Sequence, residues 1–339
     1  MKWLALLSLG AFAIAIFTSM LVTPLVRRLA SHVGMFDEAG DRRMHETPKP
    51  RIGGIAIYLG FAFALFSVAG VAISFGRFGN VELHALLGLL FGGTLIFCVG
   101  LWDDIMSMRA RNKFLAQILV TSILMLFGPD FRIHGVGNPF DHGHWIDFPA
   151  WLELSLTLVW YLGMMNAINF IDGLDGLLAG ITAISGTFLF AIAFMRGHAV
   201  VAIILIALVG AVLGFLPYNF NPAKIILGDS GALFIGFIFA IASIVGGSKG
   251  VVTISLIIPV LVLALPIVDT AATIFRRTRA GRKITEADRG HFHHQLVFRF
   301  GLNVKQAVLL IYALCFVLGA TALVLSGAIG GPFSAAKVF

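Results

Sequence analysis

Two adjacent carboxylates, Asp103 and Asp104, end an apolar stretch in the sequence GLWDDIMSMRARNKFLAQ. A helix carries partial negative charge at its C-terminus, so two carboxylates there repel both the helix dipole and each other. Solvation at a membrane surface, with compensation by Arg109 and Arg111, is the simple explanation. A bound metal ion or a cationic partner explains the pair better. Asp103 and Asp104 are therefore candidate functional residues.

A second acidic pair, Asp172 and Asp175, lies in NAINFIDGLDGLLAG, at the junction of two apolar stretches. A spacing of three residues predicts that both side chains share one helical face. Asn166 and Asn169 repeat this spacing one turn earlier. Polar groups along one face of a membrane segment cost free energy and are usually retained for a function. Helix capping and packing are the alternative explanation.

A third acidic residue, Asp229, lies at the start of an apolar stretch in PYNFNPAKIILGDSGALFIGF. One interpretation is that Asp229 caps the N-terminus of a helix. Such a cap still leaves the second carboxylate oxygen available to a ligand. A helix N-terminus also attracts phosphate groups.

Histidines and arginines gather near the C-terminal end of the chain, in DTAATIFRRTRAGRKITEADRGHFHHQL. A zinc site is a weak interpretation because no cysteine lies nearby. Histidines beside several arginines suit a phosphorylated polyanion, whereas the arginines alone also suit a loop that binds anionic lipid. A second basic loop lies earlier in the chain. The simple explanation of its basic residues is that they set the orientation of the protein in the membrane. Its relevant residues are His45, Lys49 and Arg51, the last in the sequence PRIGG.

The composition indicates where these residues lie. Of the 339 residues, 59% are apolar and 12% are charged, whereas soluble domains carry roughly 25% charge. This excludes a soluble enzyme, a disordered chain and a fibrous protein. Segments long enough to span a bilayer predict an all-α polytopic membrane protein of about ten transmembrane helices, at approximately 3–25, 52–75, 84–102, 114–128, 151–170, 176–195, 199–217, 231–247, 251–269 and 304–328.

Two details of this architecture can be predicted further. The ninth span contains Pro259 and Pro266, so we expect it to be kinked or broken. The segment 130–150 is polar and rich in turn residues, which predicts an outer loop with a short hairpin. The chain 1–339 is expected to form one integral-membrane domain. Cys98 and Cys315 lie in apolar stretches and are interpreted as small hydrophobic residues.

The charges divide unequally between the two sides of the membrane. Eighteen of the 24 basic residues, including Lys305 at the last junction, fall in one set of connections, which places that set in the cytoplasm and both termini outside. Twelve of the 17 acidic residues share this side, although the positive-inside rule does not require them. These loops are expected to form the active site, and nucleic acid is not an expected partner. The loops are 26–51, 103–113, 171–175, 218–230 and 270–303.

Clustered oxygen ligands without cysteine favour Mg²⁺, with Mn²⁺ as the alternative. Carboxylate-held Mg²⁺ flanked by cations is what phosphoryl transfer requires. At a membrane surface, one substrate would be a lipid phosphate and the other a soluble nucleotide-activated group. A secondary transporter is a second hypothesis. It fits less well because the acids lie at span ends and no inverted repeat is visible.

Five motifs in order make the chain resemble the polyprenyl-phosphate N-acetylhexosamine-1-phosphate transferase family over roughly residues 20–300. They are PKPRIGG, the Asp-Asp run before KFLAQ, NAINFIDGLDGL, PAKIILGDSGALFIGF and ADRGHFHH. The His-x-His-His form resembles the N-acetylglucosaminyl branch rather than the muramoyl-pentapeptide branch. Two positions depart from the family pattern: Ser107, where some members carry a third acid, and Phe292, where Ile or Leu is common.

The resemblance implies transfer of N-acetylhexosamine-1-phosphate, most often GlcNAc-1-phosphate, from a UDP-sugar to undecaprenyl phosphate. It implies a bacterial cytoplasmic (inner) membrane enzyme whose active site faces the cytoplasm, and it leaves a homodimer open. Asp229 would be the principal Mg²⁺ ligand, with Asp104 beside it. Catalytic roles would fall to Asp103, Asp104, Asp172 and Asp175. Substrate-binding roles would fall to Asn169, Lys113, His291, His293, His294, Arg289, Arg276, Arg51 and His45.

Overall fold

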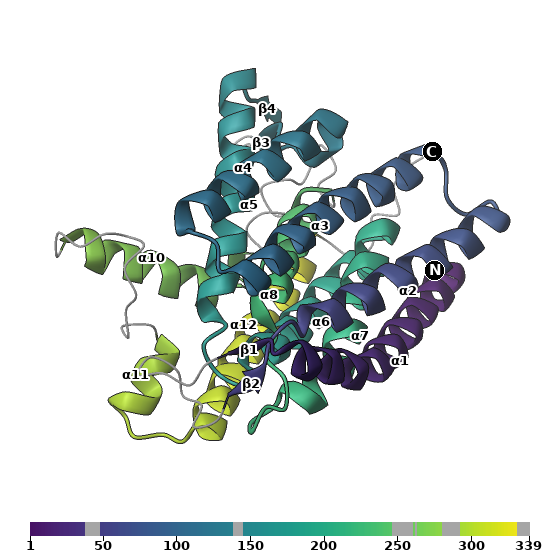
Figure 1. Cartoon of the computed structure of the whole chain (residues 1–339). Coiled ribbons are helices and arrows are strands. Elements are labelled where there is room, and N and C mark those ends of the chain that lie inside the picture. Colours follow the sequence, from purple (N-terminus) through teal and green to yellow (C-terminus); the bar gives the residue numbers. More distant parts are fainter. Residues whose placement is uncertain (38–47, 138–144, 246–259, 262, 280–291, 331–339) are drawn as a thin grey trace.

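The chain forms a bundle of membrane-length helices (Figure 1). The computed structural model describes residues 1–37, 48–137, 145–245, 260–261, 263–279 and 292–330. Within these ranges, nine helices are long and apolar enough to cross a membrane. They are α1 (Lys2–Val33), α2 (Gly54–Ser74), α3 (Asn80–Met106), α4 (Ala110–Phe127), α5 (Ala150–Ile171), α6 (Leu177–Met195), α7 (Ala199–Asn219), α8 (Gly228–Val245) and α12 (Val304–Gly330).

These helices confirm the all-α polytopic architecture, and each matches one of the predicted spans. The predicted ninth span, 251–269, and its kink at Pro259 lie largely outside the described residues. Pro266 is buried in the first turn of α10 (Ala264–Arg279). A shorter helix, α11 (Phe292–Phe298), carries two of the three predicted histidines.

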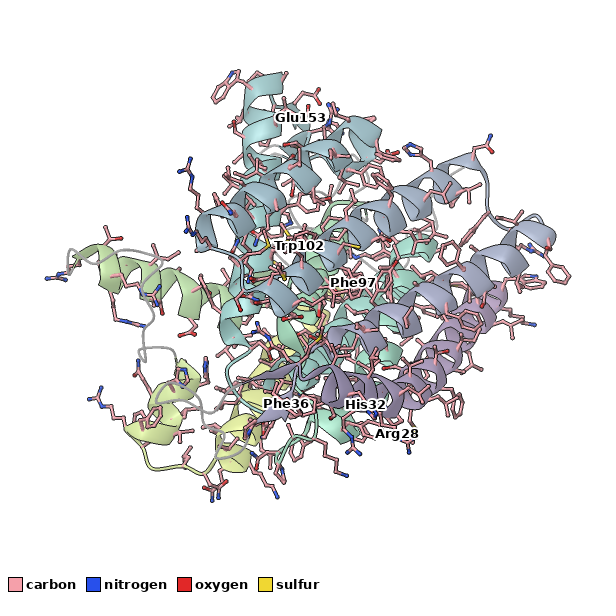
Figure 2. The ribbon with its side chains drawn as sticks, viewed as in Figure 1. Arg28, His32, Phe36, Phe97, Trp102 and Glu153 are labelled. Atoms are coloured by element: carbon pink, nitrogen blue, oxygen red, sulfur yellow. The ribbon has the colours of Figure 1, made fainter. Side chains whose placement is uncertain are left out.

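The described residues also contain one 3₁₀ turn and two small antiparallel hairpins. The turn η1 (Pro129–Phe131) precedes β3 (Gly135–Gly137), which pairs with β4 (Trp145–Asp147). This confirms the hairpin predicted in segment 130–150. The other hairpin joins β1 (Phe36–Asp37) to β2 (Lys49–Pro50). Figure 2 shows Phe36, near Arg28 and His32, at the end of the molecule opposite Glu153.

Helix α8 forms the centre of the bundle and is buried along almost its whole length. It packs between α3 and α5 and also contacts α2 and α7. In lipid, helices associate by close packing of small residues rather than by a hydrophobic driving force. The packing of α1 on α7 follows this rule, because a Cβ added at Gly210 would lie 2.6 Å from the carbonyl oxygen of Phe12.

The start of α1 and the end of α12 lie at the same end of the bundle. The Arg77 guanidinium, beyond the end of α2, lies 4.6 Å from the centroid of the Trp3 ring. Arg196, at the end of α6, donates a hydrogen bond to the carbonyl oxygen of Ser326 at 3.2 Å. The other ends of α2 and α6 carry the predicted site motifs, so these two helices run away from the site.

Candidate active site

The predicted polar motifs converge where α3 and α5 end and where α2, α4 and α8 begin. Backbone pairing brings the PRIGG segment to the start of α8. The Ile226 N–H donates to the Pro50 oxygen at 2.8 Å, and the Gly54 N–H donates to the Leu227 oxygen at 2.7 Å. Glycine is needed at position 54, because a Cβ there would lie 2.5 Å from Ser230 Oγ. This pairing fixes Arg51 beside α8.

The Asp104 carboxylate caps the N-terminus of α8 from a different helix. Its Oδ1 accepts a hydrogen bond from the Asp229 N–H at 2.7 Å, and its Oδ2 accepts one from the Ser230 N–H at 2.9 Å. Gly228 has a φ of +79°, and a Cβ there would lie 2.6 Å from Asp104 Oδ2. Asp104 therefore supplies the cap that the sequence suggested for Asp229, and the Asp229 carboxylate is left for other partners.

The Asp229 carboxylate contacts side chains from three separate segments of the chain. Arg51 Nη2 lies 2.9 Å from its Oδ2, and Lys113 Nζ lies 2.8 Å from its Oδ1. Asn169 on α5 donates a hydrogen bond to the same Oδ1 at 2.6 Å. The structure thus brings together Arg51, Lys113, Asn169 and Asp229, as the sequence predicted.

Each of the two cations also contacts a second carboxylate. Lys113 Nζ lies 2.9 Å from Asp103 Oδ2, and Arg51 Nε lies 2.9 Å from Asp104 Oδ1. The other Asp103 oxygen accepts the Met108 N–H at 2.6 Å. These contacts explain why α3 continues to Met106 rather than ending before the acidic pair: the cations and the N-terminus of α8 offset the charge at its last turn. The expected loop boundary at residue 103 was therefore too early.

Asp172 lies just beyond the end of α5 and not on a helical face. The helix ends at Ile171 and Asp172 is its C-cap, so the expectation that the helix carries both Asp172 and Asp175 was wrong. Burial raises the pKa of Asp172 to about 8, with further contributions from the charges of Asp229 and Asp104. Within the described residues, the Asp172 carboxylate forms no ion pair. The charge of Arg51 offsets part of this rise in the pKa of Asp172.

Asp175 contacts a different set of neighbours. Its Oδ2 lies 2.8 Å from Lys49 Nζ and accepts hydrogen bonds from Asn221 Nδ2 at 3.1 Å and the Ala223 N–H at 2.9 Å. Asp175 thereby joins the end of α5 to the loop that precedes α8. The contributions of Asn221 and Ala223 were not predicted, and no local sequence signal indicates them.

Gln117 was also missed by sequence reasoning. Its Oε1 accepts a hydrogen bond from Asn166 Nδ2 at 2.7 Å, inside the bundle between α4 and α5. Gln117 follows Lys113 by one helical turn, so a search for polar residues at a spacing of four would have found it.

Only part of the histidine motif lies within the described residues. His293 is buried, with 1% of its surface exposed, and it lies against Gly173, where a Cβ would collide with the imidazole. His294 lies beside it, with ring centroids 4.3 Å apart. Arg276 donates a hydrogen bond to Thr273 on its own helix at 2.8 Å. His45, Arg289 and His291 lie outside the described residues.

An apolar pocket of about 500 Å³ lies beside this polar cluster, between α5 and α10. Figure 1 shows α10 projecting from the bundle on this side. The pocket extends along α5 from Phe148, next to β4, to Ala167, which precedes Asn169 by two residues. Its walls include Val159, Gly163 and Ala167 on α5 and Ile267, Ala271 and Ile274 on α10.

In the described part of the chain, no three His, Cys, Asp or Glu side chains are grouped as a ready-made metal site. The oxygen donors are nevertheless the type that Mg²⁺ prefers. Asp103, Asp104 and Asp229 pair with two cations, Lys113 and Arg51, and Asp172 adds a fourth carboxylate, which leaves a formal excess of two negative charges when all four are ionised. The donor set therefore fits a divalent cation.

The helices form a membrane bundle, with a cluster of carboxylates, a lysine and an arginine at one end and an apolar pocket along α5. These features define a class of membrane proteins suited to binding phosphate-bearing lipids. Comparison with known proteins is consistent with this class. Residues 86–247 match the family model described as glycosyl transferase family 4.

Three relatives align over most of their length. The probable undecaprenyl-phosphate N-acetylglucosaminyl 1-phosphate transferase of Bacillus subtilis is 35% identical, over 94% of this chain and 85% of that protein. The decaprenyl-phosphate N-acetylglucosaminephosphotransferase of Mycobacterium tuberculosis is 35% identical, over 92% and 80%. The undecaprenyl-phosphate alpha-N-acetylglucosaminyl 1-phosphate transferase of Escherichia coli K12 is 30% identical, over 90% and 80%. The chain belongs to glycosyl transferase family 4.

Proposed function

We propose that this protein transfers GlcNAc-1-phosphate from UDP-GlcNAc to undecaprenyl phosphate, which yields undecaprenyl-diphospho-GlcNAc and UMP. This would be the first step in building a cell-surface polysaccharide. The observation that carries the proposal is the Asp229 cluster, in which Arg51 and Lys113 bridge three carboxylates at a span end. The names of the relatives support the same reaction. Another UDP-N-acetylhexosamine is the alternative donor.

The two substrates need different surroundings, and the molecule offers both. The apolar pocket between α5 and α10 suits the first isoprene units of a polyprenyl tail. The polar cluster suits phosphates, because an arginine and a lysine lie where a polyanion would need compensation. Asn169, Asp172 and Asp175, on and after the end of α5, would line the nucleotide and pyrophosphate site. His293 would contribute from α11.

Mg²⁺ is the proposed cofactor, held by Asp229 with Asp172. Asp104 would contribute less than expected, because both of its oxygens already accept backbone N–H groups of α8. A bound divalent cation would stabilise the ionised form of Asp172. When bound, Mg²⁺ would neutralise pyrophosphate charge and polarise the phosphorus centre.

The attacking phosphate hardly needs a general base to remove a proton, since the lipid phosphate is largely dianionic at neutral pH. An oxygen of that phosphate attacks the β-phosphorus of the UDP-sugar. The bond from this phosphorus to the bridging oxygen breaks, and UMP leaves. Arg51 and Lys113 offset the repulsion between the two polyanions. Asp103, held by Lys113, orients the acceptor or takes a residual proton.

A two-step route through a phosphosugar intermediate on an aspartate is the competing mechanism. It predicts isotope exchange between labelled UMP and UDP-GlcNAc in the absence of any lipid phosphate. We expect no such exchange. Its observation would favour the two-step route while leaving the overall reaction intact.

The decisive experiment measures UMP release from UDP-GlcNAc by the purified protein. We expect release that requires both Mg²⁺ and undecaprenyl phosphate, and a loss of at least about 10²-fold in Asp229→Asn, because a pre-organised electrostatic contact is removed. Asp130→Asn changes an exposed carboxylate outside the cluster and should retain activity. Failure to release UMP from any UDP-N-acetylhexosamine would overturn the proposal.

The proposed location is the bacterial cytoplasmic membrane, with the site facing the cytoplasm, as the excess of basic residues at this side suggests. Single cysteines test it in a chain that lacks Cys98 and Cys315. Ser31 and Ser74 are both exposed, at the site end of α1 and the opposite end of α2. An impermeant maleimide added to intact cells should label Ser74→Cys and not Ser31→Cys. The reverse result would invert the orientation.

A further inference from the structure

Helix α10 separates the apolar pocket from the histidine segment and presents a different face to each. Ile267, Ala271 and Ile274 line the pocket. Asp269 is 8% exposed, a degree of burial that is rare for a carboxylate unless it has a partner. The Asp229 cluster does not account for this residue, and no sequence motif singled it out.

One partner of Asp269 is Phe292, the first described residue of α11. The Phe292 N–H donates a hydrogen bond to Asp269 Oδ1 at 2.8 Å. A carboxylate that accepts a backbone N–H at the N-terminal side of a helix fixes the position of that end. Asp269 thereby holds the N-terminal side of α11 against α10.

The next residue, His293, is the side chain whose position depends on this hydrogen bond. His293 is almost completely buried and lies against Gly173, the residue after Asp172. There is no room for a side chain at position 173, so the imidazole fits only when α11 starts at the right place. A small shift of α11 would move the imidazole relative to the Asp172–Gly173 turn.

We propose that Asp269 is a positioning residue, which fixes the start of α11 and so holds His293 against the Asp172–Gly173 turn of the active site. The proposal rests on the proposed function in one respect: His293 must serve the reaction. In this role Asp269 acts through α11 and not by contact with either substrate.

The experiment compares Asp269→Leu with Asp269→Asn in the full-length protein. The Asn side-chain oxygen still accepts the Phe292 N–H, whereas Leu cannot. We expect Asp269→Leu to lose roughly 10- to 10²-fold in kcat/KM, as expected when a functional group is misplaced, and Asp269→Asn to stay close to wild type. Thr278→Ala removes an exposed hydroxyl that bonds its own helix and should have no effect.

Two readouts separate positioning from general damage. Amide hydrogen exchange of α11 should accelerate in Asp269→Leu and not in Asp269→Asn. In a double-mutant cycle, Asp269→Leu should cost little once His293→Ala is present. Additive losses, or unchanged exchange in α11, would overturn the proposal. If Asp269→Leu does not fold, Phe292→Pro removes the same hydrogen bond from the donor side and should give the same exchange and kinetics.

The exchange measurement does not depend on turnover, so the two proposals can fail separately. A wild-type protein without transferase activity would overturn the proposed function, while α11 exchange would still report whether Asp269 fixes the helix. An active wild type whose Asp269→Leu variant keeps native exchange and native kinetics would overturn the positioning role alone.

Discussion

At the scale of single residues, the site is organised by cations that each serve two carboxylates. Lys113 lies between Asp103 and Asp229, and Arg51 lies between Asp104 and Asp229. These contacts offset the repulsion between the carboxylates. A phosphate or a divalent cation bound here would exchange partners with this network of ion pairs.

Replacing Lys113 tests this exchange. Lys113→Gln leaves Asp103 and Asp229 without their shared cation, and removal of one partner from a buried pair costs about 3–5 kcal/mol. We expect a lower Tm in EDTA and a larger rise in Tm on adding Mg²⁺ than in wild type, because the metal ion would replace the missing charge. Thermal unfolding with and without Mg²⁺ measures both.

Lys305→Gln is the matched control, since Lys305 is exposed at the start of α12 and forms no ion pair with any described residue. Its response to Mg²⁺ should equal that of wild type. An Mg²⁺ response in Lys113→Gln no larger than in wild type would contradict the view that Lys113 and the metal ion compensate the same carboxylates.

At the scale of elements, two helices must keep a fixed register for their side chains to meet at one atom. Lys113 on α4 and Asn169 on α5 both contact Asp229 Oδ1. One turn further into the bundle, the hydrogen bond from Asn166 to Gln117 joins the same two helices. This part-buried pair is suited to set the register of α4 against α5.

Gln117→Leu should therefore reduce activity more than stability. Loss of one neutral hydrogen bond costs about 0.5–1.5 kcal/mol, yet a shift of Lys113 relative to Asn169 can lower the rate by up to about 10²-fold. Steady-state kinetics and thermal unfolding on the same preparation compare the two effects. The double variant with Asn166→Leu should lose little more than either single variant. Full additivity of the two changes would show that the pair does not act as a unit.

At the scale of the whole molecule, sequence periodicity and charge predicted most of the architecture. Nine predicted spans have matching helices because an apolar segment of about 20 residues has few alternatives in a bilayer. The same reasoning could not locate the end of α3, since Asp103 and Asp104 stay helical only through contacts with Lys113, Arg51 and α8. Contacts such as Asp175 with Asn221, or Asp269 with Phe292, join distant segments and leave no local pattern.

The arrangement of the bundle also separates the two proposed substrates, which makes their binding separable by mutation. The apolar pocket lies between α5 and α10, whereas the proposed phosphate-binding cations, Arg51 and Lys113, lie just before α2 and on α4. Gly163 lines the pocket on α5, and a Cβ built there meets no atom within 4 Å. Gly163→Phe should thus fill the pocket without disturbing the helix backbone.

We expect Gly163→Phe to raise the KM for undecaprenyl phosphate about tenfold or more, because one misfitted hydrophobic contact is worth 10-fold or greater, and to leave the KM for UDP-GlcNAc unchanged. Gly70→Phe is the matched control: Gly70 also lies on an exposed helix face with no atom within 4 Å of a Cβ, but on α2, away from the pocket. Initial rates with each substrate varied in turn measure both constants. Equal increases in both KM values, or the same increase in Gly70→Phe, would show that the polyprenyl tail binds elsewhere.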